Sequence, residues 1–173
     1  MIKFIKINII LFLMSINLCN ADTNIVFVDM DKILSMSKPG SSILKQLNVI
    51  NDKNLKRFEE TEKNLKKKEE KLIKQKNILS QEDFRVQLNE LKIEVNEYNK
   101  NRNAASSKLN ELKIVNTKKF LKLVNPILSK YSDVNSISLI LQKKNLIIAK
   151  SELDVTDEII ILINDQINVF KIQ

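Results

Sequence analysis

The sequence predicts an α+β fold in which a long antiparallel helical hairpin, a coiled-coil-like arm, projects from a small β-rich oligomerisation body formed by both ends of the chain. Residues 44–124 contain neither Gly nor Pro and carry an apolar repeat with a mean spacing near 3.5 residues, which is typical of coiled coils. Short β-branched runs lie before and after this stretch. Because so few strands are only marginally stable alone, we expect several chains to pool their strands in one body.

The second half of the arm carries the clearer repeat. Its members alternate at spacings of four and three residues, with one charged side chain among them: Phe84, Leu88, Leu91, Val95, Tyr98, Arg102, Ala105, Leu109 and Leu112. The first half repeats every seven residues at Phe58, Leu65, Leu72 and Leu79, with Leu44, Leu47 and Leu55 upstream. Its partner positions are polar at Thr61, Lys68 and Gln75. This seam therefore buries less than the seam of a strict heptad dimer.

A reversal of the chain is predicted between the two halves. Ser80 and Asp83 have the spacing of a capping box, and Glu82 and Asp83 suit the positive end of a helix dipole. We expect the first helix to end near Leu79 and the second to run back beside it. At roughly 1.5 Å per residue, each helix would be about 55–60 Å long, which is too long for the core of a small domain.

The N-terminal residues have the pattern of a secretory signal. Lys3 and Lys6 precede an apolar run over residues 7–16, and small residues at Cys19 and Ala21 suit a signal peptidase. We therefore assign residues 1–21 to a cleaved signal peptide, residues 22–43 and 125–173 to the body, and residues 44–124 to the arm. The apolar run is too short for a membrane span.

The body is predicted to combine three strands with short helices. Residues 24–30 form the first strand, residues 29–34 a short helix, and residues 38–41 a break that contains the only Gly of the chain, with Ser41 or Ser42 as the cap of the arm. After the arm, which we expect to end near Tyr131, residues 135–142 and 146–149 should pair as a β-hairpin. A helix should begin near Asp154 or Thr156. Residues 169–172 could form a closing strand.

Composition excludes several functions. After cleavage the chain has 27 basic and 21 acidic side chains, no Cys and no His, so neither disulfides nor the usual zinc and triad chemistry are available. Residues 45–122 hold 20 Lys and Arg against 12 Asp and Glu, a net charge of +8. Such an excess attracts anionic partners. A secretory signal and the lack of a nucleic-acid-binding motif argue against nucleic acid.

The two ends of the chain resemble the Skp/OmpH family of periplasmic chaperones. The resemblance lies in residues 25–34, which are similar to that family's first strand and "VDxxKVL"-like opening, and in residues 37–40, like its "SxxG" before the long helix. It continues in residues 145–150 and 153–160, similar to a strand followed by "DIT-x-x-I/V". The likeness covers essentially the whole mature chain, although the coiled-coil middle is generic.

The resemblance implies a homotrimer in which three arms project from a β-rich trimerisation body and enclose a cavity. Such a protein is a periplasmic holdase that keeps unfolded outer-membrane proteins from aggregating, without ATP. The single Gly agrees, because a phosphate-binding loop needs several. The resemblance also implies a weak contact of basic arm residues with anionic lipid or lipopolysaccharide. We expect no enzyme activity, no cofactor and no metal.

The candidate client-binding surface lies on the arms, where apolar side chains off the repeat stand beside basic ones. The residues are Ile73, Ile78, Val86, Lys66, Lys67, Lys74, Lys76 and Arg85. The apolar residues Leu72, Leu79 and Phe84 lie on the repeat and are expected to pack inside the hairpin instead. The matched positions of the two ends, Asp29, Gly40, Asp154 and Thr156, are interpreted as structural: Gly40 permits the turn into the arm, and Asp154 and Thr156 cap a helix.

Two other functions remain open from sequence alone. A secreted coiled-coil adaptor or scaffold would bind one envelope partner through a strictly apolar seam. The polar seam positions Lys68 and Arg102 argue against it. An enzyme of the envelope would need a polar constellation, and no pattern in the sequence indicates one.

Overall fold

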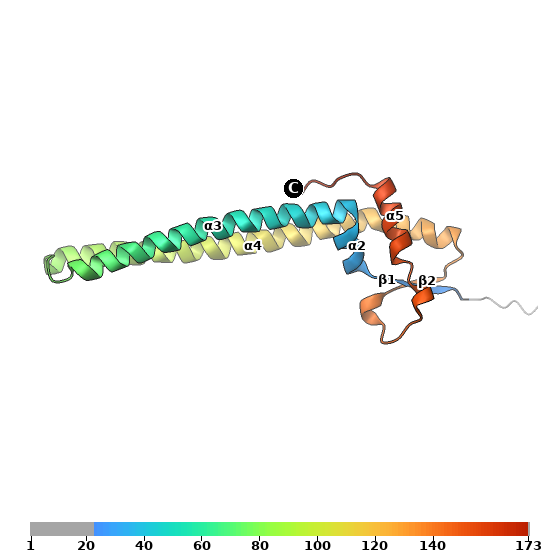
Figure 1. Cartoon of the computed structure of the whole chain (residues 1–173), viewed down its shortest axis with the longest axis horizontal. Coiled ribbons are helices and arrows are strands. Elements are labelled where there is room, and N and C mark those ends of the chain that lie inside the picture. Colours follow the sequence, from blue (N-terminus) through green and yellow to red (C-terminus); the bar gives the residue numbers. More distant parts are fainter. Residues whose placement is uncertain (1–22, 173) are drawn as a thin grey trace, which may run out of the picture.

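The protein is a long helical hairpin with a compact body at one end (Figure 1). The computed structural model describes residues 23–172, so the predicted signal peptide lies outside the described residues. The elements are β1 (Ile25–Val28), α2 (Met30–Met36), α3 (Lys38–Gln75), α4 (Gln81–Val134), β2 (Leu139–Gln142), the 3-10 turns η1 (Lys143–Asn145) and η2 (Ser151–Leu153), and α5 (Thr156–Gln166). The predicted hairpin and the body built from both ends are confirmed. The body itself is mostly helical.

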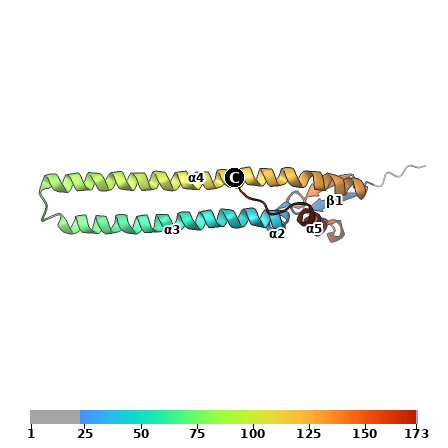
Figure 2. The same ribbon diagram turned by 90° about the horizontal axis from the view of Figure 1, so that it is seen from above.

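Helices α3 and α4 run antiparallel, side by side along the whole arm (Figure 2). The reversal lies where the sequence predicts it. The Ser80 hydroxyl accepts a hydrogen bond from the backbone N–H of Asp83 at 3.1 Å and donates to the Asp83 carboxylate at 2.6 Å, so this N-cap is confirmed. Helix α3 ends four residues earlier than expected, at Gln75, and α4 continues past Tyr131 to Val134.

The seam of the arm follows most of the predicted repeat, but its members Val95, which is 38% exposed, and Arg102 are exposed. Leu72 is buried, and Phe58, Leu65, Phe84, Leu88 and Leu109 are half-buried between the helices. Lys68, a polar residue of the seam, reaches α4 with its side chain, and its ammonium group lies 2.6 Å from the Glu94 carboxylate. The assignment of Leu55 to the seam is wrong, because this side chain is 58% exposed. Leu55 follows Asn54, which is half-buried in its place.

The core of the body lies where the base of the arm meets α2 and α5. Six side chains from four helices are fully buried there: Ile33, Ile43, Phe120, Val124, Ile159 and Ile163. The expected burial of the α4 base and of the apolar face of α5 is therefore confirmed. The polar side chain of Asn116 is also fully buried and donates to the Leu112 carbonyl at 2.7 Å.

The sheet joins the two ends of the chain directly. Strand β1 pairs with β2 in parallel, with Ile25 opposite Leu139 and Val28 opposite Gln142, and Phe27 bridges to Asp154 on the other side. The predicted β-hairpin over residues 135–149 is wrong. Its first half became β2, but η1 follows at once, and residues 146–149 form no strand. The parallel partner of β2 comes from more than a hundred residues upstream, a pairing that local alternation cannot indicate.

The break before the arm is a helix start, not a loop. Helix α3 begins at Lys38, and the Ser37 hydroxyl caps it by accepting from the Gly40 N–H at 3.2 Å. The assignment of this cap to Ser41 or Ser42 is therefore wrong. Gly40 is helical and serves close packing: a Cβ there would lie 2.1 Å from the Leu34 carbonyl oxygen. Gly40 thus permits the turn from α2 into α3 by its lack of a side chain, while its own backbone is helical.

Asp29, Thr156 and Asp154 tie the two ends together. The predicted cap of α5 by Asp154 or Thr156 is wrong, because Val155 is the N-cap residue of α5 and its side chain makes no capping hydrogen bond. The Asp29 N–H donates to the Thr156 hydroxyl at 2.9 Å, and the Asp29 carboxylate caps α2 by accepting from the Lys32 N–H. The Asp154 carboxylate accepts from the Thr156 N–H at 3.0 Å and from its hydroxyl. Lys143 lies within 3.7 Å of both carboxylates.

The last residues leave α5 as an extended segment. Helix α5 ends at Gln166, and Ile167 has extended backbone angles. The closing strand expected over residues 169–172 is wrong, because this segment lies on the base of α3 and pairs with side chains there.

Candidate functional site

The apolar candidates of the arm lie at its tip, where the sequence places them. Ile73 lies in the last turn of α3, Ile78 in the turn between the helices, and Val86 in the second turn of α4. Their side chains are 64%, 82% and 47% exposed. The repeat members Leu72 and Leu79 are turned inward instead, the first buried and the second half-buried. The tip therefore presents apolar side chains that the hairpin does not need for its own packing.

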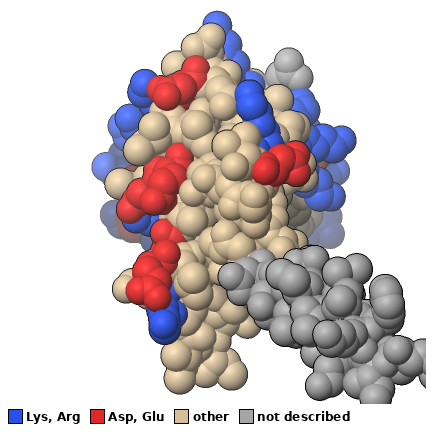
Figure 3. Space-filling model, turned by 90° about the vertical axis from the view of Figure 1, so that its right-hand side faces the viewer, with Lys and Arg blue, Asp and Glu red and all other residues tan. Residues whose placement is uncertain are grey.

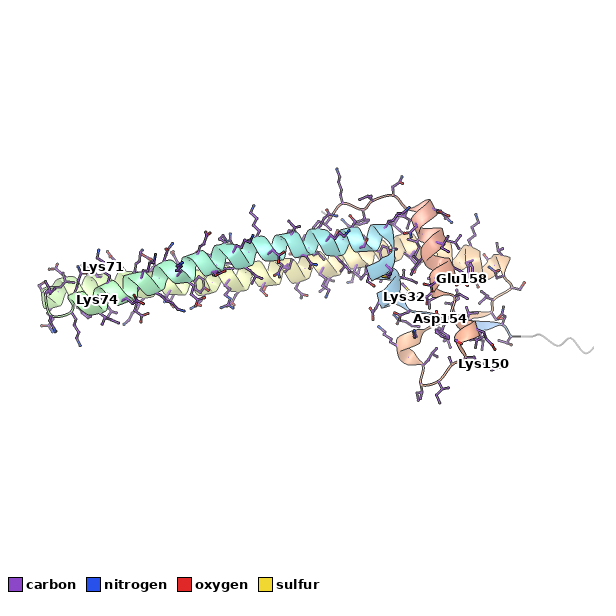
Figure 4. The ribbon with its side chains drawn as sticks, in the orientation of Figure 1. Lys32, Lys71, Lys74, Lys150, Asp154 and Glu158 are labelled. Atoms are coloured by element: carbon purple, nitrogen blue, oxygen red, sulfur yellow. The ribbon has the colours of Figure 1, made fainter. Side chains whose placement is uncertain are left out.

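The basic candidates surround these apolar residues and extend along α3. Lys74, Lys76 and Arg85 lie at the tip with the apolar three, and Figure 4 shows Lys71 and Lys74 projecting there. Lys66 and Lys67 lie about 10 Å farther back, at roughly 1.5 Å per residue. The structure therefore brings six of the eight candidates together and leaves two on the shaft.

Two of the basic candidates are partly neutralised by their own helix. Lys66 lies 3.0 Å from Glu62, and Arg85 lies 2.9 Å from Glu82. The hydrogen bond between Lys66 and Glu62 raises the pKa of the lysine and lowers the pKa of the glutamate. Both pairs are exposed, so each can open at small cost. In the described chain, Lys67, Lys74 and Lys76 make no ion pair and carry the free positive charge.

The space between the helices is shallow and open along the arm. A hollow of about 660 Å³ lies at the middle of the arm, lined by seam residues such as Leu65, Leu91 and Tyr98. Next to it, Tyr98 meets Phe58 edge-on with ring centroids 5.9 Å apart, and Arg57 lies 4.6 Å from the centre of the Phe58 ring. The arm thus combines loosely covered apolar surface with charged rims along much of its length.

The body carries exposed apolar surface that no sequence pattern assigned to a site. Ile147 and Ile148 follow η1 and are 99% and 91% exposed. Leu139 on β2 is 46% exposed. Within residues 23–172 the sheet has two strands, so the outer edge of β2 has no partner strand. The apolar run over residues 146–149 could have indicated this surface, but it predicted a strand, and nothing in the sequence indicated that its side chains would be exposed to solvent.

A second apolar surface lies between the end of α4 and α5. A hollow of about 460 Å³ is lined by Ile127, Tyr131, Val134, Ile161 and Leu162, with Lys130 and Glu158 among its polar residues. Burial and the nearby Glu158 raise the pKa of the Tyr131 phenol. Figure 3 looks onto the body end, where uncharged surface lies among scattered carboxylates and most Lys and Arg groups lie at the margins.

The Asp154 carboxylate at the joint of the two ends is held in its charged form. Burial acts to raise the pKa of Asp154, but hydrogen bonds from Thr156 and the Lys143 charge outweigh it and leave that pKa lowered. Lys32, whose ammonium group lies 2.7 Å from Asp157, has a raised pKa because of that hydrogen bond. These groups use their polar atoms on one another, as a structural joint does.

The described residues offer surfaces for non-covalent binding. Across residues 23–172, no three His, Cys, Asp or Glu side chains gather as metal ligands would. In the same range no helix has both the length and the hydropathy to cross a bilayer. Exposed apolar side chains beside free ammonium groups can bind an extended chain that is itself part apolar and part acidic.

Comparisons with known proteins agree with this description. The model of the family described as outer membrane protein (OmpH-like) matches residues 24–162. A crystal structure at 2.83 Å from Caulobacter crescentus CB15, of a protein proposed to be an OmpH-like outer membrane chaperone, aligns with a TM-score of 0.77. That alignment has 13% identity and covers 88% of this chain and 90% of the other, so it shows a shared fold. No curated protein matches.

Proposed function

The chain belongs to the OmpH-like (Skp) family of outer membrane protein chaperones, and on that premise we propose that it is an ATP-independent holdase of the periplasm. It binds unfolded outer-membrane β-barrel proteins between its arms and prevents their aggregation. It holds its clients without chemical change, since membership of a chaperone family implies binding without catalysis.

The arm is the observation that carries this proposal. Helix α3 has 38 residues, about 57 Å at roughly 1.5 Å per residue. The seam of the arm is only half-buried, and the tip of the arm exposes Ile73, Ile78 and Val86 among free lysines. A client of variable size needs binding elements that can bend and that hold many sequences weakly. A hairpin with a thin seam and scattered apolar side chains meets both needs.

A homotrimer would complete the body. The open edge of β2 and the exposed run over residues 146–149 offer backbone groups and apolar side chains that one chain leaves uncovered. Strands from neighbouring copies can pair with such edges and cover such side chains. Three arms projecting from one body would then enclose the client. This arrangement divides the chain into a body, residues 22–43 and 125–173, and an arm, residues 44–124.

The excess of lysine in the arm would serve capture. Attraction between opposite charges speeds encounter more than it strengthens the final complex, and salt weakens it. The same lysines would give weak contact with anionic lipid or lipopolysaccharide. Nothing in this proposal requires ATP, and the one Gly of the chain is packed inside α3 against Leu34.

The holdase function is tested by dilution of an outer-membrane β-barrel protein out of urea. Light scattering should rise without the mature protein and stay low with it, in the absence of nucleotide. The quintuple variant Ile73→Ser, Ile78→Ser, Val86→Ser, Lys74→Gln and Lys76→Gln should protect less well at equal concentration. If light scattering rises equally with and without the wild-type protein, the holdase function is contradicted and an adaptor for one specific partner is favoured.

The electrostatic part is tested separately by a charge-matched pair of variants. Lys67→Gln, Lys74→Gln and Lys76→Gln should slow client capture at low salt and reduce its salt dependence. The control is Lys130→Gln, Lys144→Gln and Lys171→Gln, which removes the same charge from the body. Equal capture rates for both variants would remove the arm charges from the mechanism.

A further inference from the structure

The C-terminal segment, residues 167–172, runs from α5 back along the base of the arm (Figure 1). The family match ends at residue 162, so this segment lies beyond the family pattern. It has no regular secondary structure of its own. Side chains of α3 hold it in place, which makes the base of α3 a site that is already occupied.

Gln46 holds this segment by its backbone. Its side-chain N–H donates to the Phe170 carbonyl at 2.7 Å, and its side-chain oxygen accepts from the Ile172 N–H at 3.2 Å. The Ser42 hydroxyl donates to the same carbonyl at 3.1 Å. One side-chain amide thus pairs with the carbonyl of one residue and the N–H two residues later, much as a residue of a neighbouring strand would. Backbone pairing of this kind is indifferent to sequence.

The side chains of the segment show that this site also requires apolar residues in its ligand. Phe170 and Ile172 are half-buried against the core of the body, as is Ile167, whereas Lys171 between them is exposed. Residues two apart in an extended chain point to one side. The site therefore accepts an extended backbone with apolar side chains at alternate positions. Strands of outer-membrane β-barrels have this alternation.

We propose that Ser42 and Gln46 at the base of α3 form a second client-binding site, which accepts an extended segment with alternate apolar residues and which the chain's own C-terminal segment occupies at rest. This inference rests on the proposed holdase function for the identity of its ligand. A tethered segment competes at an effective concentration of about a millimolar. The site would therefore open only to clients that the arms have already brought near.

The alternative is a strap that only stabilises the base of the arm. The two roles differ in what happens when the segment is released. If the segment is only a strap, its release creates no new binding activity. If the segment occupies a binding site, its release lets that site bind another extended peptide. The substitutions Phe170→Ser and Ile172→Pro both weaken the segment, the first by removing its apolar anchor and the second by removing the N–H that Gln46 accepts. Neither alters α3.

The test uses the full mature chain and a fluorescent peptide with the sequence of residues 167–172, followed by anisotropy. Binding by Phe170→Ser or Ile172→Pro should be at least tenfold tighter than by the wild-type protein. Adding Gln46→Glu should abolish the gain, because a carboxylate cannot donate to the Phe170 carbonyl of the peptide. A peptide with Ser in place of the phenylalanine is the control ligand and should bind weakly.

Circular dichroism on each variant shows that the helices are retained. Equal peptide binding by the wild-type and released proteins would overturn the inference, and so would a gain that Gln46→Glu leaves intact. The holdase assay runs in parallel on the same samples. Client holding without peptide binding contradicts this second site alone, whereas peptide binding without client holding contradicts the proposed function and leaves the site established.

Discussion

The arm and the body are built from the same helices but differ in how much they bury. Where the body meets the base of the arm, six apolar side chains from four helices are fully buried. Along the arm, between residues 48 and 115, Leu72 alone is buried. Stability in a protein follows buried apolar area, so the tip of the arm can open while the body stays folded. The difference shows how one continuous helix can be an anchor at its base and a flexible binding element at its end.

The largest expected effect is in the core, where the base of the arm meets the body. Phe120→Ala removes a fully buried ring from the core and should cost about 3–5 kcal/mol of the free energy of unfolding. Urea unfolding followed by circular dichroism measures this. Because the core joins both helices of the arm, the arm should be lost with it. A loss below about 1 kcal/mol would mean that the body is not the anchor.

The next largest effect is expected in the seam of the arm. Leu88→Ser, Leu91→Ser and Leu109→Ser together should remove much of the arm's helicity, since each half-buried Leu contributes on the order of 1 kcal/mol. The proposed homotrimer should survive, because the strands of the body and its six fully buried side chains are unchanged. Circular dichroism and solution mass report the two properties.

The matched control for the arm is a triple substitution of exposed apolar residues of α4. Ile93→Ser, Ile114→Ser and Val115→Ser change the same chemistry at side chains that are 51%, 47% and 38% exposed. This variant should keep its helicity. An equal loss of helicity in both triple variants would contradict the assignment of Leu88, Leu91 and Leu109 to the seam.

A smaller effect concerns the joint between the two ends. Asp154→Ala should cost about 1 kcal/mol at pH 7, because the Thr156 N–H loses its hydrogen-bond acceptor. The pKa of Asp154 is lowered from the ordinary aspartate value of 3.8, so this stability is fully present above that ordinary value and is lost as the pH falls through the lower pKa of the folded protein. Urea unfolding at pH 7 and pH 3 should therefore show a difference between wild type and variant that shrinks in acid. The exposed Asp165→Ala should change little at either pH.

The smallest effect is the ion pair that crosses the arm. A double-mutant cycle with Lys68→Met and Glu94→Gln should give a coupling energy of at most about 1 kcal/mol. Both side chains are partly exposed, so added salt should weaken the coupling. A coupling that stays large at high salt would mean that the seam depends on this pair.

The sequence predicts the arm well because its signals are local. A repeat of 3.5 residues requires only that neighbouring turns present the same face, and the cap at Ser80 is read within four residues. The exposure of Ile73, Ile78 and Val86 follows from the same repeat. Their role in client binding remains a prediction that only binding experiments can test.

The body is less predictable because its contacts join distant residues. Strand β1 pairs with β2 across the whole arm, which local alternation cannot show. Residues 146–149 have the composition of a strand, yet the described chain offers them no partner. The contact of Gln46 with the C-terminal segment joins a side chain to a backbone 124 residues away. Only the folded arrangement brings these groups together.

The most direct test of the central claim is the solution mass of the mature protein, measured by light scattering alone and after dilution of an unfolded outer-membrane β-barrel protein into it. We predict a trimer that gains one client and keeps it soluble. A dimer whose mass is unchanged by the unfolded protein would contradict it, and the shared fold would then serve another function.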